Sequence, residues 1–187
     1  LKQTLPFTDV FMPSLEEALK IVFPYEYARI DAEGGDFISK VPLDLIKELG
    51  ETLTSYGAKI VLIKAAHRGL YLWTGDITSI RDKKLLPLSV KEWNHQQLCC
   101  NAYQVVEEKI KNASGAGDTS AAAFLTAMLN GELPGVAMQY AAVAGRNNLY
   151  CNDIYAELTD WVTMTAELNK EPNPVLNVKD LVGNPTS

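Results

Sequence analysis

One short string of the sequence, residues 112–119, most strongly constrains the fold and the chemistry of this chain. It reads Asn-Ala-Ser-Gly-Ala-Gly-Asp-Thr and runs directly into a segment of small and apolar residues, 120–129. Two glycines allow the backbone to approach a ligand closely and to turn successive N–H groups toward one concave face. A helix that begins here adds its unpaired N–H donors and its positive dipole end. The string therefore predicts a loop and a helix N-terminus that bind an anion.

A single carboxylate, Asp118, lies at this junction. Beside a loop that only binds an anion, an acidic residue is unfavourable, because like charges repel. It is useful if Asp118 accepts a proton from a hydroxyl that then attacks a bound phosphoryl group. The pattern thus favours a kinase that acts on an alcohol. The alternative is that Asp118 only caps the helix, and Gly115, Gly117 and Asp118 by themselves leave both interpretations open.

Strands and helices are predicted to alternate along the chain. Apolar runs predict strands at residues 9–12, 59–64, 70–73 and 104–109. The turn at residues 65–69 predicts that the second and third of these strands form a hairpin. Helical spacing and capping residues predict helices at residues 14–22, 25–32, 42–56, 118–130, 134–147 and 155–166. Such alternation is typical of an α/β fold with a mostly parallel sheet flanked by helices, whose ligands lie beyond the carboxyl ends of the strands. Residues 76–100 show no clear pattern. After a domain at residues 1–170, residues 171–187 predict a loosely packed, extended C-terminal tail.

The string at residues 112–118, followed by three alanines and a phenylalanine at 121–124, resembles the C-terminal signature of the phosphofructokinase B (PfkB), or ribokinase-like, family of carbohydrate kinases. The resemblance implies a three-layer ribokinase-like fold. It covers nearly the whole chain but only the C-terminal, nucleotide-binding half of the family's pattern. The half with the first strands, most sugar contacts and the lid is expected to be missing. The resemblance also implies transfer of the γ-phosphoryl group of ATP, with Mg²⁺, to a hydroxyl of a sugar or sugar-like molecule.

In this family one acidic residue and several main-chain amides act together on the phosphoryl group. By the resemblance, Asp118 is the catalytic base that removes the proton of the sugar hydroxyl. The amides of Gly115, Ala116 and Gly117 would hold the charge that develops on the transferred group.

The resemblance also implies two metal-binding positions. Ser14 and Glu17 stand where the family usually carries Asn-x-x-Glu, so Ser14 would contact the cofactor and Glu17 would order water around Mg²⁺. Taken alone, these two residues favour a capping box that only begins a helix. Asn112 and Ser114 match positions that coordinate a monovalent cation in potassium-dependent relatives, although Asn112 lacks the charge of the usual aspartate.

Lys64 and Gly69 border a loop that the family places against the nucleotide phosphates. Lys64 would neutralise a phosphate oxygen as a point charge, and a solvent-facing strand end is the alternative role. Ala66 replaces the family's usual glycine, which narrows the permitted backbone angles. Asn148 ends a segment that borders the adenine pocket in the family, so it is a candidate nucleotide contact.

Charge and composition exclude several classes of partner. The net charge is −6 and no basic run offsets it, which argues against a nucleic-acid or acidic-membrane partner. No apolar stretch approaches the length of a membrane span, no secretory signal is predicted, and the three cysteines lack disulfide or zinc spacing. The prediction is a cytoplasmic protein with reduced thiols. The expected partners are a nucleotide and a sugar or sugar-like molecule, and a homodimer is possible.

Two other classes of function remain open. A non-catalytic nucleotide-binding module would keep the anion-binding loop without turnover. An assembly module would complete its sheet with another chain, because a truncated parallel sheet exposes an edge. A P-loop ATPase is disfavoured, since no Gly-x-x-x-x-Gly-Lys-Ser/Thr string occurs.

Overall fold

Five strands form one sheet in the order β1-β2-β3-β4-β5 in the computed structural model, which describes residues 1–80 and 87–181. The strands are β1 (Val10–Phe11), β2 (Ile60–Lys64), β3 (Leu70–Thr74), β4 (Gln97–Cys100) and β5 (Val175–Asn177). β1 and β2 are parallel, whereas the other three pairings are antiparallel. The mostly parallel sheet that the sequence predicted is therefore wrong for the described strands. Residues 65–69 join β2 to β3 directly, and so short a turn permits only an antiparallel pair.

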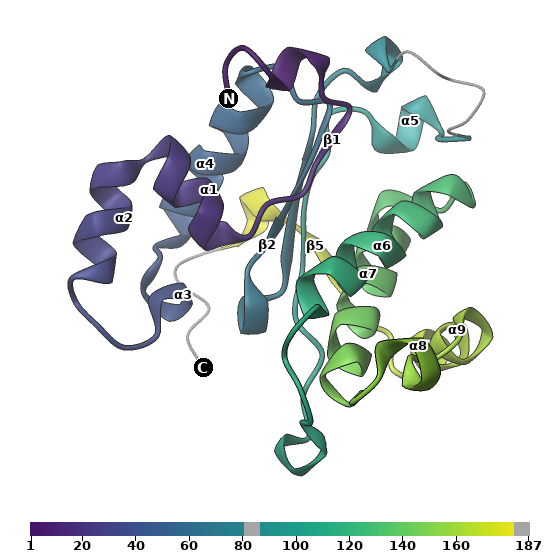
Figure 1. Cartoon of the computed structure of the whole chain (residues 1–187). Coiled ribbons are helices and arrows are strands. Elements are labelled where there is room, and N and C mark those ends of the chain that lie inside the picture. The colour runs from purple at the N-terminus through teal and green to yellow at the C-terminus, as the bar shows by residue number, and fades with distance from the viewer. Residues whose placement is uncertain (81–86, 182–187) are drawn as a thin grey trace.

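Helices cover both faces of this sheet, as Figure 1 shows. One face carries α1 (Leu15–Val22), α2 (Pro24–Asp31), α3 (Phe37–Lys40) and α4 (Leu43–Ser55). The other carries α6 (Ala116–Leu129), α7 (Pro134–Leu149), α8 (Ile154–Glu157) and α9 (Trp161–Lys170), with the short α5 (Val90–Trp93) near one end of the sheet. This arrangement confirms the predicted three-layer α/β fold class.

Alternate residues of the central strands enter two different hydrophobic cores. In β2, Ile60 and Leu62 pack with α6 and α7, whereas Val61 and Ile63 pack with α1 and α4. β3 divides in the same way, with Leu72 on the first side and Trp73 on the second. Because successive side chains of a strand point to opposite faces, a continuous apolar run is what a sheet covered on both faces requires. The unbroken apolar run of β2 therefore fits its central place between two helical layers.

Several predicted elements differ from the structure. The strand predicted at residues 104–109 is wrong, because this stretch holds only a short 3-10 turn at Glu107–Lys109. β3 pairs on its other side with β4, which lies in the region that showed no sequence pattern. The helix predicted at 155–166 is divided into α8 and α9, and Asp160 begins the second by accepting a hydrogen bond from the Thr163 N–H. Part of the unassigned region, residues 81–86, lies outside the described residues.

The C-terminal segment is packed rather than loose. β5 pairs with β4 through Val175, which lies opposite Cys100, and Val178 is buried. The expected loosely packed tail is therefore wrong over residues 171–181, and residues 182–187 lie outside the described part. Two prolines, Pro172 and Pro174, led to the expectation of a loose tail, but both lie just before the paired residues and leave the N–H groups of the strand intact.

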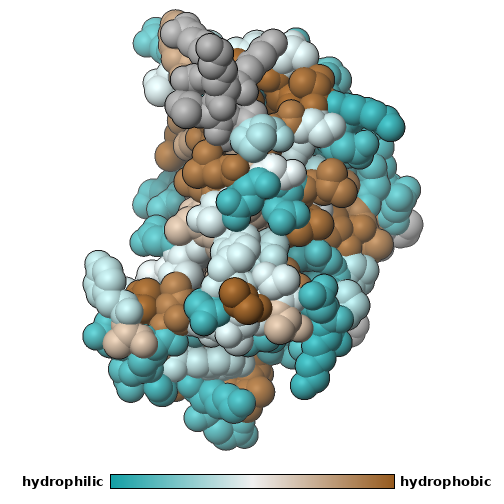
Figure 2. Space-filling model, turned by 90° about the vertical axis from the view of Figure 1, so that its right-hand side faces the viewer, coloured by the Kyte–Doolittle hydropathy of each residue, from teal (hydrophilic) through white to brown (hydrophobic). Residues whose placement is uncertain are grey.

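The surface of the α6–α9 layer is mixed in polarity. Figure 2 shows this face, on which hydrophobic residues are exposed between polar ones. Exposed apolar side chains there include Leu125 of α6 and Val162 of α9. Over the ranges 1–80 and 87–181, the structure contains no helix with both the length and the apolarity that crossing a membrane demands.

Candidate active site

The N-terminus of α6 presents main-chain N–H groups that have no partner. Gly115 adopts a left-handed conformation, with φ of 80°, immediately before the helix, and its carbonyl accepts from the Thr119 N–H at 2.8 Å. Within the described residues, the N–H groups of Gly115, Gly117 and Asp118 make no hydrogen bond. The Ala116 N–H instead donates to the Ala113 carbonyl at 3.4 Å. The donors available to an anion are therefore those of the first helical turn, at its positive dipole end.

Asp118 is the third residue of α6, and its side chain is exposed. In the described part of the chain, its carboxylate has no hydrogen bond or ion pair. The residue at the cap position is Gly115, and no side chain caps this helix. The interpretation in which Asp118 only caps the helix is therefore wrong, and the carboxylate is free to interact with another molecule.

A buried amide holds this turn in place. Asn148 of α7 is 1% exposed; its Oδ1 accepts from the Thr119 hydroxyl at 2.8 Å, and its Nδ2 donates to the Ser114 carbonyl at 3.0 Å. The two bonds reach the chain on either side of Gly115. This geometry gives Asn148 a positioning role at the turn. The nucleotide contact that the sequence suggested for it stays a prediction.

Asn148→Ala is expected to lower the free energy of unfolding by about 1–3 kcal/mol, because two hydrogen bonds, to the Thr119 hydroxyl and the Ser114 carbonyl, are lost. It should also speed amide hydrogen exchange at Thr119, whose N–H bond closes the turn. Asn147→Ala is the matched control, since Asn147 is the preceding residue and is also buried but bonds to Arg146 and Glu167. Unchanged exchange at Thr119 in Asn148→Ala would contradict the positioning role.

Lys64 brings a positive charge to the same turn. It ends β2, and its Nζ donates to the Gly117 carbonyl at 3.4 Å. The Lys64 main-chain N–H is held by the Pro13 carbonyl at 3.0 Å, so the end of β2 lies beside the start of α1. Segments that are far apart in the sequence thus meet at the N-terminus of α6. The predicted alternative, a strand end that only faces solvent, does not describe this lysine.

Ser14 and Glu17 form the capping box that their spacing predicted. The Glu17 N–H donates to the Ser14 hydroxyl at 3.2 Å, and the Ser14 N–H donates to Glu17 Oε2 at 2.9 Å. These hydrogen bonds from Ser14 hold the pKa of the Glu17 carboxyl below its usual value, and the nearby Lys64 ammonium lowers the pKa further. Glu17 is therefore ionised at neutral pH, with Oε1 available beyond the capping box.

Other predicted site residues have structural partners. A Cβ at Gly69 would lie 2.1 Å from the Cys100 carbonyl oxygen, so Gly69 is required for packing. Ala66, which replaces the glycine usual in the family, adopts a positive φ of 47°. The Asn112 Oδ1 accepts from the Ser114 N–H at 2.9 Å. The cation role of Asn112 and Ser114 stays a prediction. Among the described residues, no group of three or more His, Cys, Asp or Glu side chains could hold a metal.

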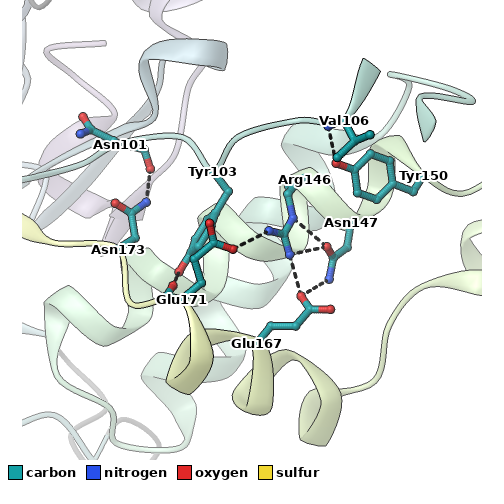
Figure 3. Close-up of polar contacts among 9 residues, drawn as sticks. All are labelled: Asn101, Tyr103, Val106, Arg146, Asn147, Tyr150, Glu167, Glu171 and Asn173. Atoms are coloured by element: carbon teal, nitrogen blue, oxygen red, sulfur yellow. Dashed lines mark hydrogen bonds and ion pairs between the residues drawn. The ribbon is translucent and has the colours of Figure 1, made fainter. Parts of the chain in front are cut away.

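Sequence reasoning missed a polar network at the end of α7, which Figure 3 shows. Arg146 donates to Glu167 of α9 at 2.7 Å and lies over the Tyr103 ring at 5.0 Å. Tyr103 in turn donates to the Glu171 carbonyl, and burial raises the pKa of Tyr103 to about 12. The network ties α9 and the segment before β5 to α7. An arginine within an otherwise small and apolar helix was the one signal that could have revealed it.

A cavity of about 380 Å³ opens beside Asp118, between α6 and the α8–α9 segment. Its lining is formed by Asp118, Thr119, Ala122, Ala123, Thr126, Ala144, Ile154, Leu158, Trp161 and Met164. Asp118 is therefore at the edge of a hollow that can hold a small molecule, and the unpaired amides lie one turn away at most.

Comparison with known proteins identifies the fold. No family model matches the sequence, and no curated protein matches it. Among solved structures, ribokinase from Thermotoga maritima matches with 15% identity and a TM-score of 0.60, over 90% of this chain and 45% of that chain. Arabidopsis thaliana ribokinase, in complex with ribose and ATP, matches with 17% identity and a TM-score of 0.61, over 90% and 43%.

An Escherichia coli protein described as a ribokinase II, in complex with ATP and Mg²⁺, matches with 16% identity and a TM-score of 0.60, over 91% of this chain and 42% of that chain. The fold of this chain is therefore ribokinase-like. The chain spans less than half the length of the structures that it matches, which is consistent with the C-terminal half that the sequence suggested.

Proposed function

We propose that this chain is the nucleotide-binding part of a kinase that transfers a phosphoryl group from ATP to a hydroxyl of a sugar or sugar-like molecule. The observation that carries the proposal is the meeting of three features at the start of α6: unpaired amides, the Lys64 ammonium and the free Asp118 carboxylate. The ribokinase-like fold supports it, since ribokinases with this fold are described in complex with ribose and ATP and with ATP and Mg²⁺.

Each group has a distinct chemical task in the proposed reaction. Asp118 accepts the proton of the acceptor hydroxyl as its oxygen forms a bond to the γ-phosphorus, and the bond from that phosphorus to ADP breaks. The amides of Gly117 and Asp118, with that of Gly115, stabilise the negative charge on the transferred group. Lys64 adds a positive charge from the end of β2.

Glu17 is the residue that fits Mg²⁺. Its carboxylate is ionised, and the capping box engages Oε2 while Oε1 has no bond in the described structure. A single carboxylate oxygen suits Mg²⁺, which keeps most of its waters and neutralises phosphate charge when it is bound. The Ser14 main-chain N–H fixes the position of this carboxylate by donating a hydrogen bond to Oε2. K⁺ at Asn112 and Ser114 stays a separate prediction.

Binding of Mg²⁺-ATP tests the proposal. Calorimetry should show binding to the chain, and Lys64→Met should weaken it about tenfold, as loss of a charged phosphate contact worth roughly 1.4 kcal/mol requires. Lys91→Met is the control, because Lys91 pairs with Glu92 and its side chain is 89% exposed. Absence of Mg²⁺-ATP binding would rule out the proposed function. Binding without turnover across a panel of sugars would support the non-catalytic nucleotide-binding module instead.

A further inference from the structure

The cavity beside Asp118 is almost entirely apolar. Buried Ala123, Ala144 and Met164 form its floor, while Ile154 and Trp161 belong to its walls. The Trp161 ring stacks on Tyr140, with centroids 4.0 Å apart and planes 14° apart, so its position is held by a second aromatic ring. The walls therefore offer a fixed apolar surface within reach of a group that interacts with Asp118.

Few polar groups in this cavity are free to bind a ligand. Polar side-chain atoms among its lining residues belong to Asp118, to two threonines and to Trp161, through its indole N–H. The Thr119 hydroxyl donates to Asn148 at 2.8 Å, and the Thr126 hydroxyl donates to the Ala122 carbonyl at 2.9 Å. Both threonine protons are therefore used inside the protein. Among the lining side chains, the Asp118 carboxylate and the Trp161 indole N–H have no hydrogen-bond partner in the described structure.

A free sugar suits such a cavity poorly. Its many hydroxyls outnumber the two free polar groups of the lining, so several would lose water without gaining hydrogen bonds, and each unpaired buried polar group is unfavourable. An aromatic or alkyl group has no hydroxyls that would lose water, and its binding is favourable because apolar surface is removed from water. One hydroxyl, placed at Asp118, gives the free carboxylate its hydrogen bond.

We propose that this cavity binds an aromatic or alkyl substituent of the acceptor, so that the preferred substrates are sugar-like alcohols that carry such a group next to the reacting part. The inference rests on the proposed function and names the substrate class of the same site. The acceptor hydroxyl lies at Asp118, and the apolar substituent lies between Ala122 of α6 and Trp161 of α9.

A matched pair of ligands tests this inference. Phenyl β-D-ribofuranoside and methyl β-D-ribofuranoside share the sugar and differ in the apolar group. The chain should bind the phenyl compound at least about tenfold more tightly by calorimetry, as burial of one ring in an apolar pocket predicts. Ala122→Leu fills the cavity from the exposed face of α6 and should remove this preference. Ala28→Leu, at an exposed position of α2, should leave the preference unchanged.

Mg²⁺-ATP titrations of the same samples separate the two proposals. Equal affinity for the two ribosides in a chain that binds Mg²⁺-ATP would overturn the substrate inference and leave the proposed function standing. A phenyl preference that survives in Ala122→Leu would also overturn it, because the ring would then bind elsewhere. Tight binding of the phenyl compound by a chain that does not bind Mg²⁺-ATP would instead overturn the proposed function.

Discussion

Asp118→Asn is expected to lower the rate of phosphoryl transfer by about 10²- to 10⁴-fold, the usual contribution of a general base. The amide has nearly the shape of the carboxylate but cannot accept the proton of the acceptor hydroxyl. Binding of Mg²⁺-ATP should persist, since the neighbouring amides and Lys64 are unchanged. The measurement is the release of ADP in the presence of an acceptor, compared with the wild-type chain under the same conditions.

The fold should survive this substitution, because the Asp118 side chain is exposed and has no partner within the described residues. Asp44→Asn is the matched control: Asp44 also lies in the first turn of a helix, α4, and its side chain is 96% exposed. It removes the same interaction with a helix dipole but none of the proposed chemistry. A rate for Asp118→Asn close to that of the wild type would remove the assignment of the base.

Gly69→Ala is expected to lower the free energy of unfolding by roughly 2–5 kcal/mol, measured by urea denaturation. Gly69 has φ of 82° and ψ of −139°, a conformation that side chains rarely adopt. A Cβ there would lie 2.1 Å from the Cys100 carbonyl oxygen and 2.6 Å from the Ala102 nitrogen. These are main-chain atoms at the end of β4, so no side-chain rotation relieves the overlap.

Gly34→Ala isolates the part of this effect that comes from the backbone angle alone. Gly34 also has a positive φ, 64°, but a Cβ would meet nothing within 4 Å. Gly34→Ala should therefore lower the free energy of unfolding by only about 1–2 kcal/mol. Equal losses for Gly34→Ala and Gly69→Ala would show that the close approach to β4 does not matter. A larger loss for Gly69→Ala would show that position 69 requires glycine because the main chain is closely packed there, whether or not a nucleotide binds.

Much of the candidate site could be predicted from short stretches of sequence. The capping box of Ser14 and Glu17 and the helix start after Gly115 both follow from residues three or four positions apart. The unbroken apolar run of β2 predicted a strand between two helical layers, and the structure confirms it. Local spacing was enough here because each of these features depends on contacts within one turn or one strand.

The hairpin of β2 and β3 was predicted and is confirmed, but the antiparallel pairings of β4, the strand β5 and the polar network of Arg146 could not be predicted in this way. β5 is only three residues long, and it forms because Val175 pairs with Cys100, which is far away in the sequence. Arg146 gains its role from Glu167 and Tyr103, which lie on a different helix and a different loop. No periodic pattern within one segment records such partners.

The sequence by itself determined the chemical groups of the site and the local turns that hold them, because hydrogen bonds within a turn are set by neighbouring residues. Only the tertiary structure decided which of these groups meet. Lys64 reaches Gly117, and Asn148 holds Thr119, because packing of the sheet between two helical layers brings the end of β2 and the end of α7 to the start of α6. Burial of apolar surface drives that packing, and it acts between segments without regard to their separation along the chain.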